Sequence, residues 1–183
     1  MPDGEYTLGL RLFEFGCQVE QSRDISSVAR PYMEHLAQRT GASVVLSICE
    51  SGSVITLDQV QPRSNLHVVS NVGARLPIYC TSQGKVFLAH MKAADAQKLL
   101  QRQTFVSFTP HTITDIPTLL QKLSECREAG YAIENGEYKI GLCSISAPVF
   151  TRDGTVAYTT GVIGMFRSIH CDEFAAAVEQ VRA

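Results

Sequence analysis

LPIYCTSQGKVFLA, residues 76–89, is the stretch in which an apolar strand-like run stops at small polar residues and a helix begins. Thr81 and Ser82 are favoured N-cap residues, so the backbone N–H groups that follow them would be the unpaired donors of the new helix. Such a helix end attracts anions, Gly84 leaves its backbone uncovered, and the Lys85 side chain lies nearby. The stretch therefore predicts either a site for a small carboxylate or an ordinary capped helix with a solvated lysine.

Helices are expected where apolar residues recur every three or four positions and polar or proline residues mark a start. Within the second of these segments the N-cap candidates lie at 24–27, and Gly41 is expected to follow its end. In the fifth, Pro117 falls near the first turn and Gly130 marks the stop. The expected helices cover residues 8–19, 24–40, 82–91, 94–101, 114–129 and 173–182.

Two β-hairpins decide the fold class. The runs 44–49 and 54–60 flank a short Gly-containing turn, and the long apolar run 142–150 turns back at 151–154 into 155–164. Further strands are expected at 66–70 and 131–133. A parallel α/β fold would alternate strands and helices one by one, which the hairpins contradict. The sequence therefore predicts an α+β domain whose single antiparallel sheet of five or six strands is flanked by helices.

The composition indicates one folded domain without a membrane segment. Of the 183 residues, 45% are hydrophobic and 19% are charged, which is an ordinary globular mixture. The longest apolar runs are far shorter than a bilayer span, and the N-terminus lacks the basic-then-apolar order of a signal peptide. We therefore expect a cytoplasmic protein that does not contact a membrane.

The charge argues against nucleic-acid binding by this chain alone. Sixteen Lys and Arg residues oppose eighteen Asp and Glu residues, which gives a net charge of −2. A domain that grips DNA concentrates positive charge on one face, because it must displace counterions from the phosphates. The sequence has no such basic stripe.

Catalytic, metal and cofactor motifs are missing from the sequence. The six cysteines are widely scattered, with no C-x-x-C pair and no histidine at a ligand spacing. There is no G-x-S-x-G elbow, no P-loop and no G-x-G-x-x-G after a strand, and the five histidines are isolated. We therefore expect no catalytic residue, no metal site and no cofactor.

A few polar residues in apolar surroundings are candidates for a binding site. Glu134 ends an expected strand, where its carboxylate either points into a cavity or is solvated. Ser144 and Ser146 interrupt an apolar run, and a buried hydroxyl needs a hydrogen-bond partner. We expect one of these two serines to face the interior, with a ligand or a water molecule as its partner.

Seven pieces of the chain together resemble the effector-binding domain of the IclR family of bacterial transcription regulators. Each piece is a weak signal, but they occur in the order of the family and extend over nearly the whole chain. The pieces are Tyr6–Leu10, Leu36–Gly41, Val72–Pro77, Thr81–Ala89, His111–Asp115, Arg127–Ala132 and Gly141–Phe150.

The resemblance implies a GAF-like (profilin-like) sensor domain that binds a small organic acid or an aromatic catabolite. In the family, this domain controls DNA binding by an N-terminal winged helix-turn-helix, which the resemblance places outside this chain. Residues 1–20 would then be the linker and start helix, and residues 21–183 the effector-binding domain. Any contact with DNA would come only through the missing N-terminal part.

The resemblance also implies where the effector lies. The matching positions are a helix start, a strand-end acid, a hydroxyl, two positions on the last strand and three wall residues. These are Ser82, Gln83, Glu134, Ser144, Gly161, Ile163, Leu76, Val68 and Asn65. Some members have hydroxyl groups at the last-strand positions, where this chain has Gly161 and Ile163. Their absence enlarges that side or makes it more apolar, which favours an aromatic or longer acid over a very small keto acid.

The leading interpretation is thus a ligand sensor that is not an enzyme. One alternative is a small GAF-like enzyme with a reactive cysteine, for which Cys80 at the helix start is the candidate. Another is a structural oligomerisation domain, which a packed interior without a cavity would favour. The apolar residues from Leu8 to Val19 have no obvious cover, and we expect a homodimer or homotetramer.

Overall fold

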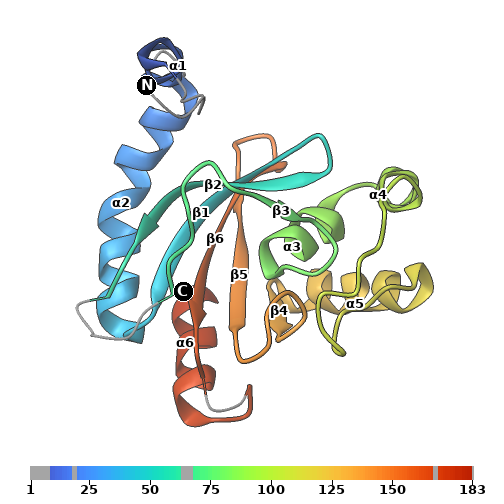
Figure 1. Cartoon of the computed structure of the whole chain (residues 1–183). Helices are drawn as coiled ribbons and strands as arrows, with labels where there is room; N and C mark the ends of the chain where they lie inside the picture. Colours follow the sequence, from blue (N-terminus) through green and yellow to red (C-terminus); the bar gives the residue numbers. More distant parts are fainter. Residues whose placement is uncertain (1–8, 18–19, 63–67, 167–168, 183) are drawn as a thin grey trace, which may run out of the picture.

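The computed structural model describes residues 9–17, 20–62, 68–166 and 169–182. In these ranges six strands form one antiparallel sheet in the order β3-β2-β1-β6-β5-β4 (Figure 1). The strands are β1 (Ser43–Glu50), β2 (Ser53–Val60), β3 (Arg75–Pro77), β4 (Ala132–Asn135), β5 (Cys143–Phe150) and β6 (Val156–Gly164). The prediction of an α+β fold with an antiparallel sheet of five or six strands is confirmed.

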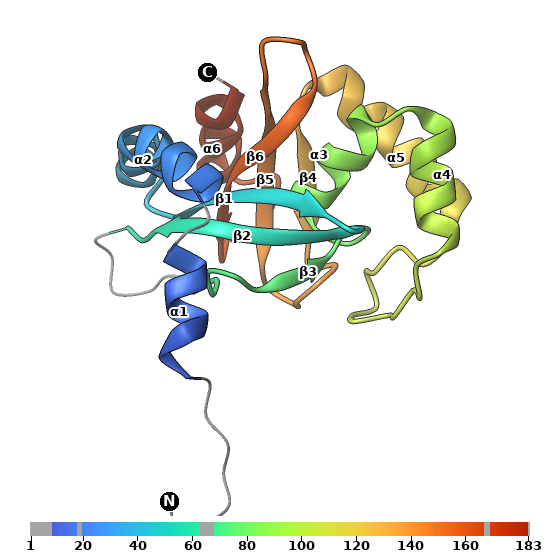
Figure 2. The same ribbon diagram turned by 90° about the horizontal axis from the view of Figure 1, so that it is seen from above.

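The helices form two groups on opposite faces of the sheet. They are α1 (Leu10–Cys17), α2 (Glu20–Thr40), α3 (Ser82–His90), α4 (Ala93–Gln101), α5 (Ile116–Ala129) and α6 (Asp172–Arg182). Helices α2 and α6 pack on one face of the sheet, whereas α3 packs on the other and contacts α4 and α5 (Figures 1 and 2). Helix α1 extends away from the sheet. In the part of the chain that is described, no helix is long and apolar enough to cross a membrane.

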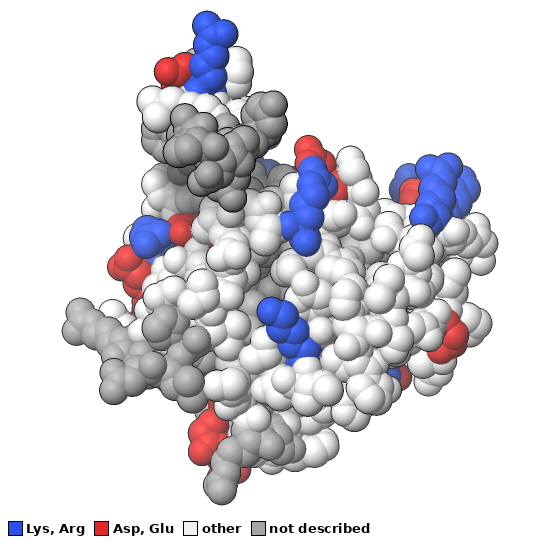
Figure 3. Space-filling model, viewed as in Figure 1, with Lys and Arg blue, Asp and Glu red and all other residues white. Residues whose placement is uncertain are grey.

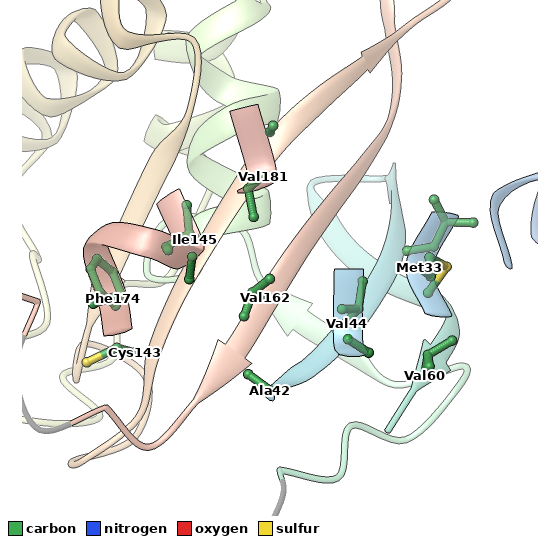
Figure 4. Packing of buried hydrophobic residues seen from close by; sticks show 13 residues of the cluster. Met33, Ala42, Val44, Val60, Cys143, Ile145, Val162, Phe174 and Val181 are labelled. Atoms are coloured by element: carbon green, nitrogen blue, oxygen red, sulfur yellow. The ribbon is translucent and has the colours of Figure 1, made fainter. Parts of the chain in front are cut away.

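The main apolar core lies between the sheet and the pair α2 and α6. Alternate residues of the central strands point into it, because successive side chains of a strand face opposite sides. Val44, Ile145 and Val162 are fully buried there against Met33 of α2 and Phe174 of α6 (Figure 4). The intervening residues of the same strands face α3 on the other side of the sheet.

Local sequence signals set several element ends. Thr81 caps α3, and its side-chain oxygen accepts a hydrogen bond from the Gly84 N–H at 3.2 Å. Asp115 caps α5 in the same way by accepting from the Thr118 N–H at 2.9 Å, and Gly130 follows this helix in the left-handed conformation. The predicted starts of α3 and α5 are therefore confirmed.

Two predicted elements are wrong. The third strand was expected at 66–70, yet the described part of that segment is not a strand, and β3 lies at Arg75–Pro77 instead. The Gln59 side chain occupies the backbone groups there, since its amide donates to the Val68 carbonyl at 2.6 Å and accepts from the Ser70 N–H at 2.9 Å. A side chain thus replaces the strand ladder that the apolar pattern favoured.

The second correction concerns α2. The sequence predicts its N-cap at 24–27, but the helix begins at Glu20 and continues through those residues. Small polar residues can also lie inside a helix, where they are neutral to unfavourable, so their presence alone does not place its start. Residues 1–8 and 18–19 of the expected linker lie outside the described residues, and the proposed boundary at residue 20 stays a prediction.

Candidate functional site

A row of side chains crosses the sheet face that α3 covers. Strand pairing places Glu134 of β4 opposite Ser144 of β5, Ser144 opposite Ile163 of β6, and Ile163 opposite Ser43 of β1. Residues that are paired in register point to the same side of a sheet. The topology therefore brings the predicted acid, the predicted hydroxyl and the predicted last-strand residue side by side.

Three serine hydroxyls connect α3 to Glu134. The Ser82 Oγ lies 2.8 Å from the Oγ of Ser144 and 2.8 Å from the Oγ of Ser146, and Ser144 donates to Glu134 Oε2 at 3.0 Å. Each hydroxyl has one hydrogen, and a carboxylate can only accept. Ser144 must therefore donate to Glu134, Ser82 to Ser144 and Ser146 to Ser82. The result is a buried chain of donors directed at one carboxylate.

The Glu134 carboxylate has three donors although it is 4% exposed. Its second oxygen accepts hydrogen bonds from the backbone N–H groups of Glu137, at 2.6 Å, and Tyr138, at 3.1 Å. Burial raises the pKa of Glu134, and the nearby Glu137 charge adds to this effect, while the hydrogen bonds from Tyr138, Ser144 and Glu137 oppose it. The site therefore presents a satisfied but electrostatically costly acceptor.

A cavity of about 190 Å³ lies above this network. Its lining comes from the segment between β2 and β3, from β3, from the start of α3, from β4 and the turn after it, and from β5 and β6. Its described lining is Val68, Val69, Ser70, Asn71, Ala74, Leu76, Thr81, Gln83, Glu134, Tyr138, Lys139, Leu142, Ser144 and Ile163.

Most of the predicted site residues meet at this cavity. Six of them contribute to the lining: Val68, Leu76, Gln83, Glu134, Ser144 and Ile163. Ser82 lies beneath the lining and bonds to Ser144. Asn65 lies outside the described residues. Gly161 does not line the cavity, because a Cβ there would lie 2.2 Å from the Ser146 Oγ, so the space at Gly161 is filled by Ser146.

Both serines of the β5 run face the interior, whereas one was expected to do so. Ser144 and Ser146 are two residues apart, so they lie on the same face of the strand. Their partners are Ser82 and Glu134 within the protein itself. A ligand or water is therefore not required to satisfy them.

The start of α3 differs from the anion site that the sequence suggested. The N–H groups of Gly84 and Lys85 are bonded to Thr81, the first to its hydroxyl and the second to its carbonyl at 3.0 Å. Gly84 is needed for packing, since a Cβ there would lie 2.0 Å from the Ile78 carbonyl oxygen. Lys85 is neither solvated nor at the cavity, because it is 2% exposed and pairs with Glu137.

Sequence reasoning missed two residues of the turn after β4. Tyr138 and Lys139 both line the cavity, and the Lys139 Nζ lies 5.9 Å from the centre of the Tyr138 ring. Lys139 is exposed, so its positive charge lies beside the cavity without the desolvation cost of a buried charge. The Asn135-Gly136 pair, which turns the chain directly after Glu134, was the signal that could have drawn attention to them.

Cys80 lacks the properties of a nucleophile. It is fully buried, and desolvation, with smaller contributions from the charges of Glu137 and Glu134, raises its pKa to about 12, although Lys85 opposes the shift. The dipole of a helix start favours a thiolate, but burial penalises the charged form of Cys80 more strongly.

A family model described as bacterial transcriptional regulator IclR C-terminal matches residues 17–183. The chain belongs to this family. It is 28% identical over 179 residues to the HTH-type transcriptional repressor AllR of Escherichia coli strain K12, and the match covers 98% of this chain and 66% of AllR. The predicted resemblance to IclR regulators is thereby confirmed.

Solved structures of the family share the fold. The Thermotoga maritima IclR structure has a TM-score of 0.86 and 25% sequence identity, covering 100% of this chain and 74% of its own. An IclR homologue from Microbacterium hydrocarbonoxydans, solved in complex with 4-hydroxybenzoate, has a TM-score of 0.85 and 25% identity, covering 100% of this chain and 73% of its own. The sheet and its flanking helices are therefore those of IclR C-terminal domains.

Proposed function

We propose that this domain binds a small organic acid with an aromatic or longer apolar body, and that binding controls an N-terminal winged helix-turn-helix. The main support is the cavity, which combines the Glu134–Ser144 network with the apolar side chains of Val68, Leu76 and Ile163. Mostly apolar lining with a few convergent polar groups is typical of small-molecule sites. The full-length protein would then be a transcriptional regulator that acts on DNA in the cytoplasm.

The polar residues of the lining suit two different groups of such a ligand. Glu134 can only accept hydrogen bonds when ionised, so it favours a ligand hydroxyl and disfavours an unshielded dianion. Gln83 and the exposed Lys139 offer donors for a carboxylate. 4-Hydroxybenzoate, which the Microbacterium homologue binds, carries both groups and is the natural first probe.

Thermal-shift measurements with a panel of carboxylates test the proposal. Saturable binding of 4-hydroxybenzoate or a longer aryl acid should stabilise the domain by about 2.7 kcal/mol at a hundred times its Kd, while pyruvate should have little effect. No turnover of the ligand is expected. A broad panel in which no acid shifts the transition would remove the main support for the proposal.

Variants of the lining residues locate the ligand. Ser144→Ala should weaken binding of an acid that carries a hydroxyl group by roughly 0.5–1.5 kcal/mol, because the Ser144 oxygen can accept from that hydroxyl while its own hydrogen bonds to Glu134. Glu134→Gln should change which acids bind more than it changes folding. Val68→Phe or Leu76→Phe should block larger acids by overfilling the wall. Unchanged affinity of both polar variants would place the ligand elsewhere.

Two alternatives receive less support. An enzyme with a reactive cysteine would need a thiolate at neutral pH, yet the pKa of Cys80 is raised to about 12 by burial. A purely structural oligomerisation domain would have no use for a cavity of about 190 Å³ lined by a buried carboxylate.

We propose that DNA contacts require the N-terminal winged helix-turn-helix. On the face shown in Figure 3, Lys and Arg side chains are dispersed among Asp and Glu side chains and form no continuous basic stretch. A gel shift should therefore detect no operator binding by this chain at submicromolar concentration and physiological salt. Adding the winged helix-turn-helix should restore binding, and a shift with the chain alone would contradict the proposal.

We also propose that the protein is a homodimer or homotetramer. Leu10, Leu12 and Phe15 of α1 are 79%, 55% and 61% exposed, and such apolar side chains on a projecting helix favour association. Regulators that read two-fold related half-sites are symmetric oligomers. Sedimentation at tens of micromolar should give more than the 20.0 kDa monomer.

A further inference from the structure

A buried ion pair joins α3 to the turn after β4. The Lys85 Nζ bonds to the Glu137 carboxylate, and the exposed fractions of the two side chains are 3% and 10%. The same nitrogen donates to the Ile133 carbonyl at 3.1 Å. Lys85 therefore contacts both ends of the segment 133–137, although neither member of the pair is among the described lining of the cavity.

Glu134 lies between these two anchoring points. Its carboxylate faces the cavity and is oriented by the backbone N–H groups of Glu137 and Tyr138. The turn that carries these donors is also held by two threonines, because Thr109 donates to the Gly136 carbonyl at 2.6 Å and Thr112 to the Glu137 carbonyl at 2.7 Å. The position of the Glu134 carboxylate thus depends on how the turn is fixed to its surroundings.

The ion pair is an expensive way to fill this space. Taking two charges out of water costs free energy that their attraction repays only with good geometry and further hydrogen bonds. Within the described residues, the second carboxylate oxygen of Glu137 is buried without a partner. An apolar pair of similar volume would serve packing equally well, so packing does not explain the charges.

We propose that Lys85 is a positioning residue, which fixes the 133–137 segment so that the Glu134 carboxylate is presented to the ligand. It acts through the turn and does not touch the ligand. The identity of the ligand rests on the proposed function, but the orientation of Glu134 can be measured in the free protein. A charged pair does what an apolar pair cannot, because the Lys85 ammonium group holds the Ile133 carbonyl and the Glu137 carboxylate at the same time.

The first measurement is thermal unfolding of three variants. Lys85→Met should lower the Tm by about 6–20 °C, because it leaves Glu137 as an unpaired buried charge. Lys85→Met combined with Glu137→Leu should recover the Tm to within a few degrees of wild type. Lys122→Met is the matched control, since it breaks an exposed ion pair with Glu125 and should leave the Tm unchanged. Failure of the double variant to fold would show that the charges serve stability and would overturn the proposal.

The second measurement is an NMR pH titration of the free protein. In wild type the chemical shift of the Tyr138 amide proton should change with pH as Glu134 ionises. The part of this change that disappears in Glu134→Gln is due to the Glu134 carboxyl group. Among the described residues, the other titratable groups that interact with Glu134 are Glu137 and the thiols of Cys80 and Cys143. Burial raises the pKa of both thiols, so they stay protonated between pH 3 and about 8.

The double variant should lose at least half of this Tyr138 response while remaining folded, and the Lys122→Met control should keep it. A folded double variant with an undiminished response would overturn the proposal, because Glu134 would then be oriented without Lys85.

Binding of 4-hydroxybenzoate separates this inference from the proposed function. If wild type binds it, the folded double variant should bind at least tenfold more weakly and the Lys122→Met control should match wild type. Equal affinity of the double variant would overturn the positioning role. If wild type binds no acid, the proposed function fails, while the Tyr138 response still decides the role of Lys85.

Discussion

The two faces of strand β5 differ in chemistry although they alternate along a single run of sequence. Cys143, Ile145 and Ala147 point towards α2 and α6 and join the apolar core. Ser144 and Ser146, between them, point towards α3 and enter the hydrogen-bond network of Glu134. One face therefore holds the sheet to its helices, and the other face carries the candidate site.

The division of labour between the two faces allows a small domain to accommodate a polar cavity. The apolar face supplies burial, which stabilises the fold in proportion to the area removed from water. The polar face bears the desolvation of a carboxylate, three hydroxyls and an ion pair, which favours specificity more than stability. Substitutions on the two faces should therefore have different sizes and different readouts.

The largest effect is expected on the apolar face. Ile145→Ala should lower the free energy of unfolding by about 2–5 kcal/mol, because Ile145 is fully buried and the neighbours can only partly fill the space. Denaturant titration measures this loss. Ile140→Ala is the control, since Ile140 is 74% exposed and its truncation should stay within about 0.5 kcal/mol. Equal losses would mean that the core is not where the structure places it.

On the polar face, Ser144→Ala should cost more stability than Ser146→Ala. Removing the Ser144 hydroxyl leaves a buried Glu134 oxygen without its donor, at a cost of about 1–3 kcal/mol. Ser146 lies at the far end of the chain of hydroxyls, and its loss should cost about 0.5–1.5 kcal/mol. The same titration ranks the two, and the reverse order would refute the assigned donor direction.

Glu134→Gln should change how the stability of the domain depends on pH. Burial raises the folded-state pKa of Glu134 above its ordinary 4.5, so the folded protein binds this proton more tightly than the unfolded chain. Wild type should lose stability relative to the variant as pH rises from about 4.5 through the raised pKa, and the difference should then level off. Stability measured from pH 4 to 8 tests this, and parallel curves would mean that the carboxyl is not desolvated.

The smallest effect is a gain. The hydroxyls of Thr159 and Ser47 are buried opposite each other on the α3 side and have no hydrogen-bond partner among the described residues. Thr159→Val replaces the unpaired hydroxyl with a methyl group of similar size and should stabilise the domain by about 1 kcal/mol. Thr159→Val should thus raise stability, whereas Ser146→Ala should lower it. A loss of stability in Thr159→Val would show that the Thr159 hydroxyl has a hydrogen-bond partner in solution.

The helix starts and hairpins were predictable because their causes are local. Thr81 and Asp115 cap helices through atoms three residues away, and Gly130 ends one by its own backbone conformation. The position of β3 was not predictable. The side chain of Gln59, which lies on another strand, bonds to the backbone groups of Val68 and Ser70 that a strand partner would otherwise use. No periodicity within residues 66–70 records that competition.

Part of the candidate site could be assigned from the sequence and part could not. Glu134 and Ser144 matched the family pattern, and strand register then places them side by side. Gly161 matched the same pattern but packs against Ser146 and does not line the cavity. Lys139 lines the cavity, although the sequence did not indicate it. Whether these residues hold a ligand stays a prediction that the lining variants test.

Alternation, caps and turn residues act over a few positions along the chain, so the α+β class, the family and most element ends could be predicted from the sequence. The roles of Gly84 and Lys85 emerge from the packing of the folded chain. Gly84 lets α3 approach the Ile78 carbonyl, and Lys85 reaches Glu137 across 52 positions of sequence. Both roles depend on short distances in space between residues whose separation along the chain carries no information about contact, and such distances exist only after the sheet and helices have packed.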